Sequence, residues 1–110
     1  MKVVIKENTW LTRDMFDFGW GNGYVLIPKD NHFHGKHYDD ININVDVHGG
    51  LTFSRLVDAK MVEDWELDKE DEGKWCVGFA TSHYDDNLSK WSKEKVQEET
   101  ERLKEQLLNQ

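Results

Sequence analysis

Apolar and polar residues alternate along the chain from residue 41 to residue 47. The apolar positions are Ile41, Ile43, Val45 and Val47. A period of two residues is typical of a β-strand that is buried on one face. A glycine pair, Gly49-Gly50, follows this segment, and residues 52–56 have the pattern of a second strand. We therefore predict a β-hairpin between residues 41 and 56.

The glycine pair decides which side chains share the exposed face of this hairpin. A two-residue turn would place His48 opposite Leu51 and mix polar with apolar groups on both faces. A glycine bulge adds one residue to the turn and pairs Val47 with Phe53 instead. The exposed face then carries Asn44, Asp46, His48, Thr52 and Ser54. Such a face is either a set of binding groups or an ordinary solvated sheet surface, since half-polar antiparallel sheets are common.

Other segments predict the rest of the sheet. Residues 2–5, 24–27 and 74–79 have the pattern of strands, and Pro28 ends the second of them. The glycine-rich residues 19–23 predict a turn. We also predict that the strand at residues 52–56 continues near residues 57–65, and that Gly78 leaves a gap for another backbone or for a ligand.

The hydrophobic period changes near the C-terminus. Val96, Thr100, Leu103 and Leu107 recur at intervals of four, three and four residues. This spacing predicts an amphipathic helix at about residues 91–108, capped by Ser89 or Ser92. The chain is thus predicted to be a single α+β domain over residues 1–110. Its architecture is an antiparallel β-sheet with the C-terminal amphipathic α-helix packed on one face.

Composition narrows the classes of function. The formal net charge of −8 opposes direct binding to nucleic acid, because that affinity comes mainly from Lys and Arg contacts to phosphates. The single cysteine, Cys76, excludes an internal disulfide and is predicted to be buried and inert. No apolar run reaches the length of a membrane span, and residues 1–7 lack a signal-peptide hydrophobic region. We therefore expect a cytoplasmic protein without a membrane partner.

Residues 58–72 contain eight acidic residues and two lysines. A run of this kind is usually a solvated hairpin or loop. The alternative is an acidic surface that binds a protein partner or mimics a nucleic acid.

The candidate chemistry lies in two polar groups. One is His48 with its neighbours, and the other is the run at residues 82–86, which follows the strand at residues 74–79. If these segments are neighbours, His48 and His83 approach each other, and Asp46 or Asp86 can set the tautomer of a histidine. We include Tyr38, Asp39, Asp40, Asp46, His48, Thr52, Ser54, His83 and Asp86 in the predicted ligand-binding site.

Two histidines and a carboxylate are also metal ligands, and a metal-bound water is a hydrolytic nucleophile. The spacing of these residues matches no known ligand motif, so we expect no metal and no cofactor. We prefer the interpretation that neutral histidines form hydrogen bonds with a ligand or with each other over the metal site. A histidine can also act as a general acid or base. The catalytic residues therefore stay unassigned.

Several strings in the chain have a specific pattern. They are Tyr38-Asp39-Asp40, then Val47-His48-Gly49-Gly50-Leu51-Thr52-Phe53-Ser54, and Gly78-Phe79 with His83 and Asp86. Together with Glu99 and Gln106 in the C-terminal segment, they resemble a family of small uncharacterised proteins of bacteriophages and prophages. The resemblance spans nearly the whole chain and implies a genomic setting more than a reaction. That family carries an aspartate after the Gly-Phe pair, where this chain has Ala80, which favours ligand binding over turnover.

The resemblance implies a phage or prophage accessory protein acting in the host cytoplasm. Such a protein can counter host defence by sequestering a nucleotide-derived immune signal. Thr52, Ser54, His48, His83 and Arg55 would supply polar contacts, and Tyr38 or a Trp would supply a stacking face. A metal- or histidine-dependent phosphodiesterase of such a signal is one alternative, and the acidic inhibitor is another. The oligomeric state stays open, homo-oligomers included.

Overall fold

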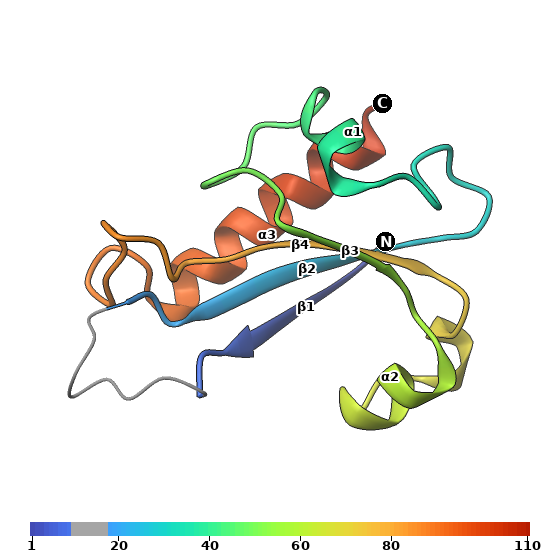
Figure 1. The fold of residues 1–110 in the computed structure, drawn as a ribbon, viewed down its shortest axis with the longest axis horizontal. Coiled ribbons are helices and arrows are strands. Elements are labelled where there is room, and N and C mark those ends of the chain that lie inside the picture. Colours follow the sequence, from blue (N-terminus) through green and yellow to red (C-terminus); the bar gives the residue numbers. More distant parts are fainter. Residues whose placement is uncertain (10–17) are drawn as a thin grey trace.

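The computed structural model describes residues 1–9 and 18–110 of the chain. Within these residues, strands form a sheet in the order β1-β2-β4-β3, and each neighbouring pair is antiparallel. One face of the sheet is covered by a long C-terminal helix (Figure 1). The strands are β1 (Lys2–Glu7), β2 (Gly21–Ile27), β3 (Phe53–Leu56) and β4 (Trp75–Phe79), and the helix is α3 (Lys93–Leu108). The predicted α+β fold is confirmed.

Strand β2 is buried on both of its faces. Val25 and Ile27 pack toward α3, whereas Leu26 packs toward the opposite layer, and all three are fully buried. A continuous apolar run suits this position, because a strand with two covered faces has no side chain directed to water. Strand β2 therefore lies in the centre of the hydrophobic core.

Helix α3 is the predicted amphipathic helix, and it buries the predicted stripe of Val96, Thr100, Leu103 and Leu107. Its N-cap is Ser92, whose side chain accepts a hydrogen bond from the Lys95 N–H, as expected for a serine before a helix. The helix lies close to the sheet at Gly23, where an added Cβ would come within 2.0 Å of the Thr100 hydroxyl. Only glycine permits this approach.

The opposite face of the sheet is partly covered by a short helix, α2 (Ala59–Asp64). The predicted continuation of the strand near residues 57–65 is therefore wrong. Asp58 caps this helix by accepting a hydrogen bond from the Met61 N–H at 2.8 Å, which starts a helical turn after Val57. Tyr24 fills the gap left by Gly78, since a Cβ there would lie 2.3 Å from the tyrosine ring.

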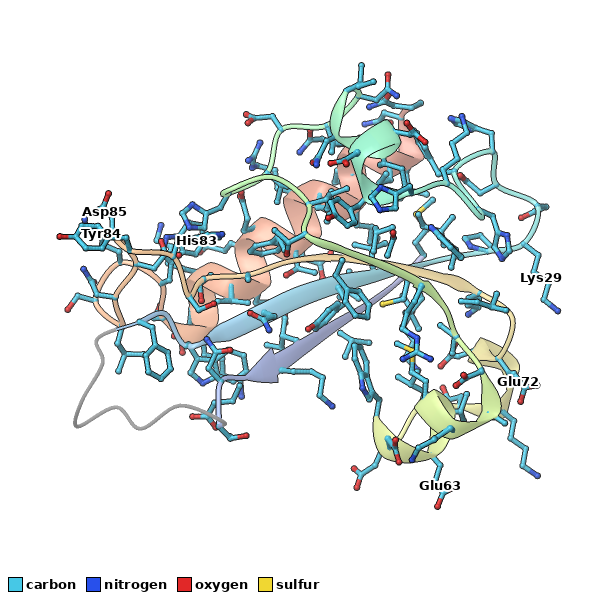
Figure 2. All side chains as sticks on the ribbon, viewed as in Figure 1. Lys29, Glu63, Glu72, His83, Tyr84 and Asp85 are labelled. Carbon is cyan, nitrogen blue, oxygen red and sulfur yellow. The ribbon has the colours of Figure 1, made fainter. Side chains whose placement is uncertain are left out.

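Some acids of residues 58–72 have structural roles. The 3₁₀ turn η1 (Lys69–Asp71) includes the buried carboxylate of Asp71, which pairs with Lys2 at 2.7 Å and with Lys74 at 2.8 Å. Burial alone would raise the pKa of Asp71, but hydrogen bonds from the two lysines lower it to about 2. Glu63 and Glu72 project from the surface instead (Figure 2).

The predicted hairpin between residues 41 and 56 is not formed. Residues 38–42 form helix α1 (Tyr38–Asn42) instead, with His37 as its N-cap. Asp39 and Asp40 lie in its first turn, where negative charge is favourable. The alternation that suggested a strand does not correspond to one buried face, because Ile41 is fully buried whereas Ile43 is 83% exposed. Strand β3 pairs with β4, so Val47 is not paired with Phe53.

The backbone that follows α1 is held by side chains of α3 and by Gln110, which lies just beyond the end of this helix. Gln106 accepts a hydrogen bond from the Asp46 N–H and donates one to the Asp46 carbonyl. Glu99 accepts one from the His48 N–H, and Gln110 donates one to the Asn44 carbonyl. Residues 44–48, which we call the helix-bound segment, thus obtain from α3 and from Gln110 hydrogen bonds that a strand would obtain from a neighbouring strand.

Two smaller predictions also have outcomes. Residues 19–23 do not all lie in a turn, because β2 begins at Gly21 and includes Gly23. Cys76 is fully buried, as predicted, and burial raises the pKa of its thiol to about 12. Among the described residues, no helix combines the length and the apolar character needed to cross a membrane.

Two leucines near the end of α3 provide a test of its packing. Leu103 is fully buried against the sheet, whereas Leu108 is 49% exposed. We expect Leu103→Ala to reduce the free energy of unfolding by about 2–5 kcal/mol, because it leaves a cavity in the core. Leu108→Ala should change it by less than about 0.5 kcal/mol. Urea unfolding followed by circular dichroism measures both values, and equal effects would contradict this orientation of the helix.

Candidate functional site

One buried carboxylate connects two histidines from distant parts of the chain. Asp86 Oδ1 lies 2.7 Å from His48 Nε2, and Asp86 Oδ2 lies 2.9 Å from His83 Nδ1. The centroids of the two imidazole rings are 5.6 Å apart, and the rings are nearly perpendicular. We call these three residues the His–Asp cluster. The sequence alone did not establish that the two segments are neighbours, and the structure brings them together.

A tight turn after strand β4 positions two members of the cluster. The backbone N–H of Asp86 donates to the His83 carbonyl at 3.0 Å, and the Asp86 carboxylate accepts from the His83 N–H at 2.9 Å. This reciprocal pairing is a local turn closed by an aspartate, a common use of that residue. His83 projects at one end of the molecule next to Tyr84 and Asp85, away from Glu63 and Glu72 (Figure 2). The turn therefore presents an imidazole beside its own carboxylate.

His48 is positioned by the helix-bound segment. Its backbone N–H donates to Glu99 Oε2 at 2.8 Å, and its ring lies against Trp91, with centroids 4.2 Å apart. Gly49, the next residue, has a φ of 68°, which glycine adopts without strain. A Cβ on Gly49 would lie 2.6 Å from His83 Cε1. Glycine thus allows the loop backbone to pass directly beside the second histidine.

Glu99 is itself held by a cation. Arg102 donates to its two carboxylate oxygens at 2.8 and 2.9 Å. Burial alone would raise the pKa of Glu99, but the hydrogen bonds from Arg102 and from the His48 backbone lower it below its ordinary value. Glu99 is therefore ionised at neutral pH and accepts the His48 N–H as a charged group.

The ionisation of Asp86 sets the tautomers of both histidines. Burial alone would raise the pKa of Asp86, but hydrogen bonds from His83 and His48 outweigh it and lower the pKa below its ordinary value. An ionised carboxylate only accepts hydrogen bonds, so the ring nitrogens that face it carry protons. In a neutral ring the other nitrogen then has a lone pair. These atoms are Nδ1 of His48 and Nε2 of His83.

This arrangement allows two kinds of chemistry. An imidazole nitrogen with a lone pair accepts a hydrogen bond from an amino or hydroxyl group of a ligand. The same nitrogen acts as a general base when a carboxylate orients the ring. His83 is better placed for both roles, because its side chain is 41% exposed whereas that of His48 is 26% exposed.

The other residues of the predicted site lie elsewhere or face solvent. The Tyr38 N–H donates to the Ser54 hydroxyl at 3.1 Å, so these two residues form a contact of their own. Asp39, Asp40 and Thr52 are exposed. Asp46 is also exposed, and its carboxylate lies 3.7 Å from Arg102. Within the described residues, no hydrogen bond joins these side chains to the His–Asp cluster.

One hollow of the surface lies away from the cluster. It has a volume of about 370 Å³ and is formed between β1 and the first half of α3. Its lining residues are Ile5, Lys93, Glu94, Gln97 and Glu98. Neither histidine lines this hollow. The candidate site therefore rests on the contacts among His48, His83 and Asp86 and on the exposure of His83, and this hollow does not support it.

Sequence reasoning missed two residues that support the site. Trp91 contacts the His48 ring but was not named for the site, and Glu99, which binds the His48 N–H, was named only within the C-terminal pattern. A signal for Glu99 was present, because it follows the buried Val96 by three residues and therefore flanks the buried face of the helix. No signal in the sequence indicates that its partner would be the backbone of His48.

Comparisons with known proteins do not add to this geometry. No protein family, curated protein or solved structure matches the chain. The function is therefore inferred from the residues themselves, and the resemblance to phage and prophage proteins stays a prediction.

The ionised state of Asp86 predicts a pH-dependent contribution to stability. A carboxyl group with a lowered pKa in the folded protein stabilises it above its ordinary value of 3.8 and loses this effect as pH falls through the folded value. At pH 7 we expect Asp86→Asn to reduce the free energy of unfolding by about 1–3 kcal/mol, because hydrogen-bond donors lose a charged acceptor. The difference from the unaltered protein should shrink below the ordinary pKa.

Urea unfolding at a series of pH values between 7 and 3 measures this difference. The exposed neighbour Asp85 provides a matched control. Asp85→Asn should change stability by less than about 0.5 kcal/mol at each pH. A difference for Asp86→Asn that stays constant down to pH 3 would show that the charge of Asp86 does not stabilise the fold.

Proposed function

We propose that this protein binds a small polar ligand at the His–Asp cluster. The observation that supports it is the shared carboxylate, which holds two imidazoles in defined tautomers and leaves one nitrogen of each ring outside the pairing. Preset polar groups of this kind are what a binding site uses to fix the orientation of a ligand. Ligand donors such as amino and hydroxyl groups are the complementary partners.

A nucleoside or a cyclic nucleotide fits these groups better than a polyphosphate does. The ionised carboxylate of Asp86 contacts both rings, and that of Glu99 lies beside His48, where the guanidinium of Arg102 is already paired with Glu99. A ligand with several negative charges would therefore meet repulsion. A base and a ribose, in contrast, offer N–H and O–H donors together with a flat ring.

The biological setting in this proposal rests on the sequence resemblance. A phage or prophage accessory protein that sequesters a nucleotide-derived signal would need a compact site and no chemistry. Its ligand would be released intact on denaturation. In this role the protein would act in the cytoplasm of the host cell and counter a defence response.

A second candidate function is a histidine-dependent phosphodiesterase of a similar compound. It is favoured by the pairing of His83 Nδ1 with Asp86, which leaves the opposite nitrogen of a partly exposed ring outside that pairing. In this role His83 would take a proton from an attacking water or hydroxyl group, and Asp86 would stabilise the resulting imidazolium. Ala80 supplies no carboxylate, so Asp86 alone would orient this base.

Incubation with a panel of adenosine-derived and cyclic nucleotides tests the proposal. After gel filtration, heat releases bound compounds, and mass spectrometry identifies them. We expect an intact nucleotide at up to one equivalent per chain. His83→Ala should weaken its binding by about 2–10-fold, the cost of one hydrogen bond of 0.5–1.5 kcal/mol.

His32→Ala is the matched control, because His32 is an exposed histidine that lies against Phe33, outside the cluster. It should leave the affinity unchanged. Recovery of an altered nucleotide would favour the phosphodiesterase, provided that His83→Ala abolishes the conversion. Failure of the whole panel to bind, or equal binding by His83→Ala, would contradict a nucleotide site at this cluster.

A further inference from the structure

We propose that the His–Asp cluster binds one divalent transition-metal ion of the Zn²⁺ class. His48, His83 and Asp86 each offer a ligand atom, and these atoms lie within 4.8 Å of one another. This inference concerns the same residues as the proposed function and deepens it. It is tested with the metal alone, so it can fail without affecting the nucleotide proposal.

The donor set selects the class of metal. Two imidazole nitrogens and one carboxylate oxygen suit Zn²⁺ and its neighbours among the divalent transition metals. Mg²⁺ and Ca²⁺ prefer sites made of oxygen atoms. A site with these three protein ligands also leaves a coordination position for water or for a ligand, as in catalytic zinc sites.

The distances require only small movements of side chains. Ligand atoms of a tetrahedral zinc site lie about 3.3 Å apart, given bonds of about 2.0–2.1 Å. The nitrogen–oxygen distances in the cluster are 2.7 Å for His48 and 2.9 Å for His83. Inserting an ion therefore lengthens two hydrogen-bonded contacts by about half an ångström and draws the two rings together. Each ring then moves its proton to its other nitrogen, so no net protonation change is needed for neutral rings.

The surrounding structure restrains these side chains. His83 and Asp86 belong to one closed turn, while His48 is held through its backbone by Glu99 and through its ring by Trp91. Gly49 keeps the loop close to His83. Such restraint lowers the conformational entropy lost when an ion binds.

The cluster also has an open side. His83 is the more exposed of the two histidines, and it projects beside Tyr84 and Asp85 at the end of the molecule (Figure 2). A metal ion and its bound water would be reachable from solvent there. A bound ion would offer its open position to an acceptor atom of the proposed ligand, and the outer ring nitrogens would then donate hydrogen bonds to that ligand instead of accepting them. In a hydrolase the ion would supply an activated water.

Titration of the tag-free, chelator-treated protein with Zn²⁺ in a calorimeter tests this site. We expect one Zn²⁺ per chain. Co²⁺ should give visible absorption bands typical of a four-coordinate site, which weakly bound surface ions would not produce. Mg²⁺ should give no binding signal under the same conditions.

Variants of the cluster connect the binding to its ligands. His83→Ala, His48→Gln and Asp86→Asn should each weaken Zn²⁺ binding by at least the roughly 10–100-fold that loss of a supporting residue costs. His32→Ala removes a histidine elsewhere and should leave binding unchanged. Circular dichroism of each variant shows whether it is folded, and His83→Ala is the most informative because His83 is exposed.

The outcomes are distinct. No binding of Zn²⁺ or Co²⁺ by the folded protein would overturn the metal site and leave the nucleotide proposal standing. Binding that is unchanged in all three variants would also overturn it, because the ion would then lie elsewhere. Zn²⁺ binding lost in His83→Ala, without any nucleotide bound in the presence or absence of Zn²⁺, would support the metal site and contradict the nucleotide proposal.

Discussion

The packing of α3 across the sheet is the constraint on which both the core and the site depend. Its apolar stripe covers one face of the sheet, and Thr100 lies against Gly23. Glu99 and Gln106, which lie beside that stripe, accept hydrogen bonds from the backbone of the helix-bound segment and so fix its position on the helix. The position of His48 thus follows from the position of the helix. A shift of α3 along the sheet would move one histidine relative to the other.

The fold could be predicted where hydrophobic period and burial agree. The apolar stripe of α3 and the apolar run of β2 are both buried, and each segment forms the element that its pattern predicts. Residues 41–47 show the opposite case. Their alternation is regular, but His37 and the acids that follow it start a short helix, and side chains of α3 then satisfy the next backbone groups. A strand needs a partner strand, and the period of two says nothing about whether one is available.

The site was predictable in part for a similar reason. His48 precedes a glycine pair and His83 follows a strand, and such positions often carry binding groups. Asp86 was a candidate because it belongs to the polar run after that strand and can set the tautomer of a histidine. Thr52 and Ser54, in contrast, were placed in the site by the hairpin register, and that register is wrong because β3 pairs with β4. Contacts between segments far apart in sequence depend on the fold, which explains why Trp91 and Glu99 were missed.

The same carboxylate serves structure and chemistry, and the two proposed occupants would affect it differently. A hydrogen-bonding ligand would take the ring nitrogens that do not face Asp86 and leave both contacts to Asp86 in place. It therefore adds to the connection between the His48 loop and the His83 turn. A metal ion replaces those hydrogen bonds with metal–ligand bonds and takes over the connection. Both occupants bind the folded state, so both raise the free energy of unfolding. Only the metal ion is bound by the Asp86 carboxylate itself, so only its stabilising effect depends directly on the negative charge of Asp86.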